Sequence, residues 1–106
     1  MGKYLLKVNY TPEGAKGLLK DGGSVRRSAA QKAAESVGGR VESMYYAFGD
    51  TDAFVIADMP DHASVAALAL TLAASGRVTS TTTVLMTPEE MDQATRKSPE
   101  YRPPGQ

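Results

Sequence analysis

The 106-residue chain contains no cysteine, only one histidine and no excess of charge of either sign. The lack of cysteine excludes disulfides, iron–sulfur clusters, thiolate zinc sites and a cysteine nucleophile. Twelve Lys and Arg balance twelve Asp and Glu, so no overall field attracts nucleic acid or an anionic membrane. No segment approaches the ~20 apolar residues that span a bilayer, and the first residues do not resemble an export signal. We therefore expect a cytoplasmic protein with neither nucleic acid nor membrane as a partner.

The composition that remains indicates one folded domain. Apolar residues make up 42% of the chain and charged residues 23%, which is ordinary usage for a globular protein. A chain of 106 residues is too short for two independent cores. Three of the six prolines fall within residues 98–106, which predicts an extended tail behind a domain that spans residues 1–97.

The first part of the chain predicts a strand followed by a helix. Apolar and polar residues alternate from Lys3 to Tyr10, the period of a strand with one buried face. Thr11-Pro12 is typical of a helix start, but four glycines between residues 14 and 23 favour only a short helical turn and a loop. Ser24 then caps a helix to about Val37, with an apolar stripe made of Val25, Ala29, Ala33 and Val37.

The rest of the chain predicts two antiparallel strands, a helix, a further strand and a short helix. The predicted strand over residues 40–48 has apolar side chains on both faces. Val41, Tyr45 and Ala47 lie on one face, and Met44, Tyr46 and Phe48 lie on the other. Turn residues 49–52 join it to a strand over 53–58. Pro60 and Asp61 open a helix that ends near residue 75, and a threonine-rich strand follows over 77–86. Thr87 and Glu90 form the capping box of a helix that ends near Lys97.

This order of elements, βαββαβ, is that of the ferredoxin-like α+β fold. Its right-handed crossovers place both main helices on one face of a four-stranded antiparallel sheet. The other face has no helix to cover it, so it is expected to pack against a second copy of the chain or to form a ligand cavity. We therefore expect a homodimer or a higher homo-oligomer.

Hydroxyl-bearing side chains on the strands are the candidate ligand-binding residues. They would line an apolar cavity with a few hydrogen-bond donors, and they are Tyr4, Tyr10, Tyr45, Tyr46 and Thr81. The ligand would be small and apolar, and nothing in the sequence requires a cofactor. Aromatic residues on a sheet are, however, more often packing material of a core or an interface.

A catalytic role would fall on His62, Tyr45 and Asp52. Histidine is the side chain that exchanges protons most readily near neutral pH, but one in the first turn of a helix is commonly just exposed to solvent. Asp50 and Asp52 point to the same side of an extended segment, which suits a hard cation, although turn formation explains such aspartates more often. No third carboxylate is close in sequence, so no metal site is expected.

Two other segments have two explanations each. Residues 22–24 would offer backbone amides to an anion beside Arg26 and Arg27, but a flexible loop with solvated arginines explains them equally well. In the tail, Tyr101 would dock on the same or a neighbouring subunit, and Arg102 would pair with a carboxylate such as Asp50. Disorder of the tail is an equally good explanation.

Several segments resemble the GYD domain family: YTPEGAKGLLKDGG at residues 10–23, the hairpin over 49–53, TTTVLMTPEE at 81–90 and SPEYRPPGQ at 98–106. The Gly-Tyr-Asp signature of that family lies near this hairpin, where Thr51 stands before Asp52 in place of the tyrosine. The resemblance implies a dimeric α/β-barrel protein, in which two ferredoxin-like sheets pack face to face. It implies a superfamily that includes monooxygenases, isomerases and polyketide cyclases, and no particular activity.

The sequence thus leaves several functions open. The first is a homo-oligomeric domain of uncharacterised activity that binds a small apolar ligand between sheet and helices or at the dimer interface. The alternative, by analogy of fold alone, is a cofactor-independent monooxygenase, isomerase or cyclase that acts on an aromatic or polyketide-like substrate. A regulatory or assembly module that uses the tail as its contact is a third.

Overall fold

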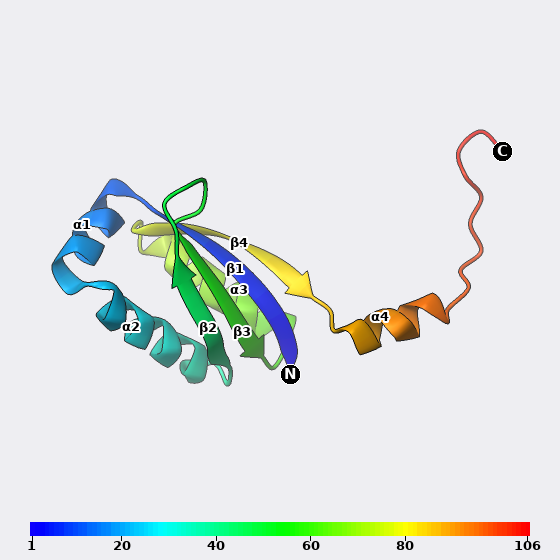
Figure 1. Ribbon diagram of the computed structural model, residues 1–106, viewed down its shortest axis with the longest axis horizontal. Coiled ribbons are helices and arrows are strands. Elements are labelled where there is room, and N and C mark those ends of the chain that lie inside the picture. The colour runs from blue at the N-terminus through cyan, green and yellow to red at the C-terminus, as the bar shows by residue number, and fades with distance from the viewer.

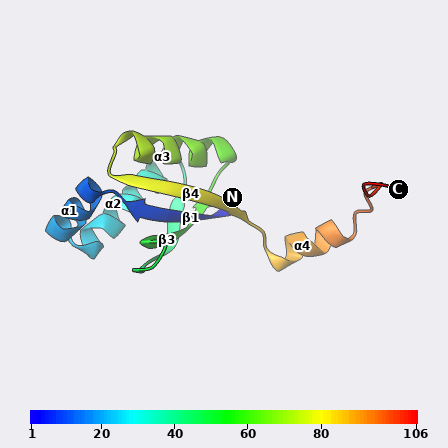
Figure 2. The ribbon, with the colours of Figure 1, turned by 90° about the horizontal axis from the view of Figure 1, so that it is seen from above.

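The computed structural model describes residues 1–106 and contains one antiparallel sheet with helices on one side of it (Figure 1). The elements are β1 (Gly2–Tyr10), α1 (Pro12–Asp21), α2 (Gly23–Ser36), β2 (Arg40–Tyr46), β3 (Ala53–Met59), α3 (His62–Ala74), β4 (Val78–Leu85) and α4 (Pro88–Thr95). The strand order is β2-β3-β1-β4, so β1 and β3 are central and β2 and β4 are edges. Figure 2 shows α2 and α3 on the same side of the sheet. The predicted α+β, ferredoxin-like fold is confirmed.

β1 sorts its side chains between the two faces of the sheet. Tyr4, Leu6 and Val8 are buried under the helices, as the alternation predicts. They pair with small or apolar residues of β3 on the same face, and the core is completed by Ala34 of α2, Val65 of α3 and Val78 of β4. The intervening residues of β1 point to the face that no helix covers, which we call the open face.

α1 is a full ten-residue helix where the sequence predicted only a short turn and a loop. The side chain of Thr11 caps it by accepting a hydrogen bond of 3.2 Å from the amide of Gly14. Gly14 does not break the helix: it allows close approach, because a Cβ atom there would lie 1.8 Å from the carbonyl oxygen of Arg77. Hydrogen bonds from Thr11 to the carbonyls of Gly76 and Arg77 fasten the start of α1 to the turn before β4.

α2 begins at Gly23, two residues before the start that a cap at Ser24 would give. Gly22 is its N-cap and makes no side-chain bond, so Ser24 is not the cap that the sequence suggested. The φ angle of Gly22 is 83°, in the region that favours glycine. The predicted stripe was also wrong at this end, because Val25 is 55% exposed. Arg26, one residue further along, is half-buried instead.

A β-bulge in β2 changes which residues face the helices. Val41 pairs with Ala57 and Met44 with Val55, so both lie on the helix side, and the register shifts between Val41 and Ser43. The sequence placed Val41 and Tyr45 on one face, which is wrong because the extra residue, Glu42, reverses the alternation beyond it. β2 ends at Tyr46, and Phe48 lies fully exposed in the hairpin loop.

The open face carries an ion-pair network at one end. The carboxylate of Asp58, which is only 5% exposed, lies 2.8 Å from Lys3 Nζ and 2.6 Å from an Arg40 guanidinium nitrogen. Lys3 also reaches Glu42 at 2.8 Å. The hydrogen bond from Lys3 holds the pKa of Asp58 below its usual range. Asp58 therefore stays ionised inside the network.

α4 and the residues after it project away from the sheet and its helices (Figures 1 and 2). The predicted capping box of Thr87 and Glu90 is present, and the helix ends at Thr95, two residues before the predicted end. Every residue from Pro88 to Gln106 is exposed, and Arg102 forms no ion pair with Asp50. We call residues 86–106 the arm. No helix of the chain combines the length and the apolar character that crossing a bilayer requires.

The close approach at Gly14 can be tested against a second glycine of the same helix. A Cβ at Gly14 would collide with backbone, so Gly14→Ala should lower the free energy of unfolding by about 2 kcal/mol or more. A Cβ at Gly17 would meet nothing within 4 Å, so Gly17→Ala should raise it by ~0.5–1 kcal/mol. Urea unfolding of both variants measures the difference. Equal effects would contradict this account of α1.

Candidate functional site

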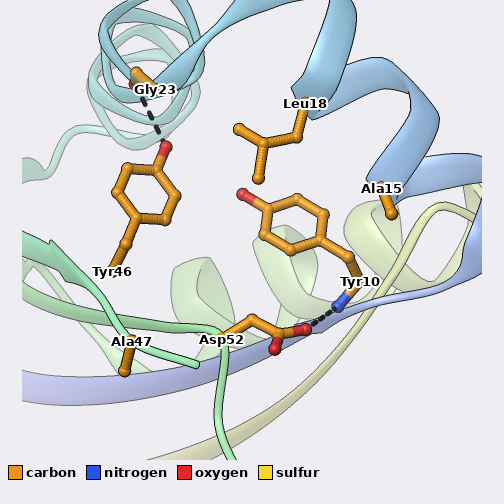
Figure 3. Close-up of a pocket in the computed structure, with 7 residues that line it drawn as sticks. All are labelled: Tyr10, Ala15, Leu18, Gly23, Tyr46, Ala47 and Asp52. Carbon is orange, nitrogen blue, oxygen red and sulfur yellow. Dashed lines mark hydrogen bonds between the residues drawn. The ribbon is translucent and has the colours of Figure 1, made fainter. Parts of the chain in front are cut away.

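An open pocket lies where β1 and β2 end beneath the first two helices (Figure 3). It has a volume of about 430 Å³ and is lined by Tyr10, Ala15, Leu18, Gly23, Tyr46, Ala47 and Asp52. Tyr10 is the last residue of β1 and Tyr46 the last of β2, so the ends of two strands bring both rings to the same side. Figure 3 shows both hydroxyl groups turned toward the helices.

The two tyrosines of this pocket have different partners. The hydroxyl of Tyr46 donates a hydrogen bond of 3.1 Å to the carbonyl of Gly23. A Cβ on Gly23 would lie 3.1 Å from the Tyr46 ring, so glycine lets the ring pack close to the start of α2. No short hydrogen bond fixes the hydroxyl of Tyr10, which lies beside the hydroxyl of Tyr46 and the side chain of Arg26 in a half-buried position. The Tyr10 hydroxyl is thus held less firmly than that of Tyr46.

Asp52 fastens the β2–β3 hairpin to the end of β1. Its carboxylate accepts a hydrogen bond of 2.8 Å from the amide of Tyr10. Its own amide donates to the carbonyl of Val8 and to Oδ1 of Asn9, each at 3.0 Å, and its carbonyl accepts from Ala47 at 2.8 Å. The aspartate that sequence analysis offered as a catalytic group therefore has a structural task that accounts for its position. Thr51, at the signature position, lies half-buried beside it in the same loop.

A second, more enclosed cavity of about 170 Å³ lies between the sheet and helices α2 and α3. Fifteen of its sixteen lining residues are hydrophobic, and they include four alanines of α2: Ala29, Ala30, Ala33 and Ala34. Alanine side chains are too short to fill the space between a helix and a sheet, which is why the cavity remains. Tyr10 lines both this cavity and the open pocket, so the two spaces adjoin at its ring.

Arg26 is the one charged residue that lines the enclosed cavity. It forms none of the ion pairs of the chain, which involve Lys3, Lys16 and Arg40. Burial raises the pKa of Tyr10, the neighbouring Tyr46 raises it further, and the positive charge of Arg26 acts in the opposite direction. Tyr10 therefore remains a neutral hydroxyl at physiological pH, next to a cationic side chain.

Tyr4 and His62 form a separate contact at the far end of β1. The Tyr4 hydroxyl is hydrogen-bonded to Nδ1 of His62 at 2.6 Å, and the two rings meet edge to face with centroids 5.7 Å apart. Tyr4 and Tyr10 are six residues apart on one strand, or roughly 20 Å. His62 and Asp52 lie beyond opposite ends of β3, so these two do not meet within one chain.

Tyr45 and Thr81 lie on the open face, across the sheet from the cavities. Residue pairing places them at the two ends of one row that crosses all four strands: Tyr45, Phe54, Lys7 and Thr81. Of the five predicted ligand-binding residues, only Tyr10 and Tyr46 are brought together. His62, Tyr45 and Asp52 occupy three separate places and form no common site within the chain.

The predicted stripe of α2 included Ala29 and Ala33, which line the cavity, but it missed Arg26, Ala30 and Ala34. The informative signal is the spacing of Arg26, Ala30 and Ala34, which recur every four residues and so share one face of a helix. Because Val25 is apolar, the sequence favoured the neighbouring face of this helix as the buried one. For metals, no group of three or more histidine, aspartate or glutamate side chains is placed to hold an ion.

Comparison with known proteins identifies the family. The family model described as GYD domain matches residues 4–95, from β1 to the last residue of α4. No curated protein and no solved structure matches the chain. Support for a function therefore comes from the geometry of the two cavities.

Two aspartates of the hairpin loop test the structural task of Asp52. Asp52→Ala should lower the free energy of unfolding by about 1–2 kcal/mol, because the amide of Tyr10 loses its acceptor. Asp50→Ala is the matched control: it is exposed and should change stability by less than ~0.5 kcal/mol. Urea unfolding at neutral pH measures both values. A loss of stability in the Asp50 variant alone would contradict the assignment.

Proposed function

The chain belongs to the GYD domain family, and on that premise we propose that it is a homo-oligomeric domain that binds a small apolar ligand between its sheet and its helices. The observation that carries the proposal is the cavity of about 170 Å³ with fifteen hydrophobic lining residues. A dry cavity of roughly 150 Å³ is enough to hold benzene. The size favours a single ring or a short aliphatic chain.

The adjoining pocket supplies a route to this cavity. It has about 430 Å³, is more open to solvent, and shares Tyr10 with the cavity. A ligand would pass the rings of Tyr10 and Tyr46 and leave its apolar part among the alanines of α2. Removing that part from water is favourable by roughly 25 cal/mol per Å² of apolar surface.

The open face supports self-association. Leu5, Ile56 and Phe54 lie on it in adjacent rows, with Leu85 at one edge and Tyr45, which is 71% exposed, at the other. Sheets pack face to face by burying such residues, and a second copy of the chain presents the same surface. The proposed homodimer would therefore cover the apolar centre of the open face.

The arm supports the same proposal. Helices as short as α4, with eight residues, gain most of their stability from packing, and α4 packs on nothing in its own chain. Its exposed apolar residues, Met86, Met91 and Tyr101, would be stabilised by a surface that covers them. We assign that surface to the second copy.

The enzymatic alternative takes second place. A cofactor-independent monooxygenase, isomerase or cyclase needs polar groups that converge on its substrate, and His62, Tyr45 and Asp52 lie apart. A cytoplasmic location stays a prediction from the sequence.

Ligand binding can be followed at the methionine methyl groups. Met44 lines the cavity, whereas Met86 and Met91 are exposed on the arm, so 1-hexanol should shift the Met44 methyl signal in NMR spectra and leave the other two unchanged. Ala30→Leu places a larger side chain in the cavity and should weaken 1-hexanol binding by ~10-fold or more, by the loss of buried apolar area. Ala67→Leu, on the exposed side of α3, is the control and should bind normally. Unchanged binding in the Ala30 variant would remove the cavity from the proposal.

Self-association can be measured by light scattering. The protein should have the mass of a dimer or a higher oligomer at high micromolar concentration. Ile56→Lys puts a charge in the centre of the open face and should yield monomers, while Ala67→Lys on the helix side should not. Met91→Lys should weaken association if the arm packs on the second copy. A monomeric wild-type protein would refute the dimer.

A further inference from the structure

Arg26 is the feature of the cavity that a purely apolar ligand leaves unexplained. It lies on α2 four and eight residues before Ala30 and Ala34, so the same face of the helix presents all three to the sheet. Arg27, the next residue, is exposed on another side of the helix. A cationic group turned toward an apolar space loses hydration, and it is retained at lowest cost when an anion pairs with it.

The chain itself provides no such anion. Arg26 takes part in no ion pair, and the nearest carboxylate of the two adjoining spaces, that of Asp52, already accepts the amide of Tyr10. The group that Arg26 does have beside it is the hydroxyl of Tyr10, an uncharged partner that is also able to donate a hydrogen bond to a ligand. The apolar cavity thus ends at two donors and at no anionic group.

We propose that the ligand is a small organic carboxylate, whose apolar body fills the cavity and whose carboxylate is bound by Arg26 and the hydroxyl of Tyr10. The inference rests on the proposed ligand-binding function and names its ligand class. Arginine has five N–H donors in a planar fork that matches a carboxylate, and neither it nor a neutral tyrosine hydroxyl favours a cationic head group. The cavity of about 170 Å³ limits the body to roughly six carbon atoms, by comparison with the benzene-sized cavity.

Three probes of equal length separate the charge of the head group from the apolar body. Hexanoate, 1-hexanol and hexylamine are titrated into the full-length protein, and the Met44 methyl signal reports binding. The expected order of affinity is hexanoate, then 1-hexanol, then hexylamine, with ~10-fold between the first two because charge-assisted hydrogen bonds are the stronger kind.

The matched variants are Arg26→Gln and Arg27→Gln. Arg26→Gln should bring the affinity for hexanoate down to that for 1-hexanol and leave 1-hexanol binding unchanged, while Arg27→Gln should retain the full preference. Arg26→Lys keeps the charge without the planar fork of donors and should retain part of the preference for hexanoate. It replaces Arg26→Gln in the test if that variant folds poorly. Tyr10→Phe should lower hexanoate affinity by a smaller factor.

The outcomes separate this inference from the function on which it rests. If 1-hexanol shifts Met44 but hexanoate binds no better, or if Arg26→Gln keeps the preference for hexanoate, the carboxylate assignment is wrong and the apolar cavity stands. If none of the three probes shifts Met44, both proposals fail.

Discussion

The structure depends on the hydrogen bonding of β1 along both of its edges. β1 pairs with β3 over seven residue pairs and with β4 over eight, and so fixes the register of the central sheet. Because its side chains alternate, this register decides which residues of the neighbouring strands face the helices. The last residue of β1, Tyr10, then stands at the meeting point of the two cavities, and the next residue, Thr11, caps α1.

The cavity follows from the small residues between that sheet and α2. Interiors of proteins are close-packed, and a void of this kind forfeits contacts that larger side chains would make. α2 nevertheless presents alanines and one arginine to the sheet, while the bulky residues belong to β1 and to α3, which supplies Leu68 and Leu72. A helix with small residues on its inner face stabilises the fold less than a helix with leucines there would. The space gained is therefore the feature of α2 that most needs a functional explanation.

The order of the elements could be predicted because it rests on local signals. Alternation identified β1, and the Thr87 and Glu90 capping box identified α4. The site could not be predicted, because it depends on contacts between distant residues. The bulge at Glu42 exists only in the pairing of β2 with β3, and Gly14 has its meaning only beside Arg77. Arg26 resembles any solvated arginine until the sheet beneath α2 is known.

The cavities and the open face lie on opposite sides of the sheet. In the proposed dimer, a second copy on the open face would leave Tyr10 and the route past it accessible to solvent. Ligand binding and dimer formation would then use separate surfaces. Neither would shift the equilibrium of the other, except through the sheet that lies between them. The apparent affinity for a ligand would be independent of protein concentration, and dilution to monomers would change the mass of the particle without emptying it.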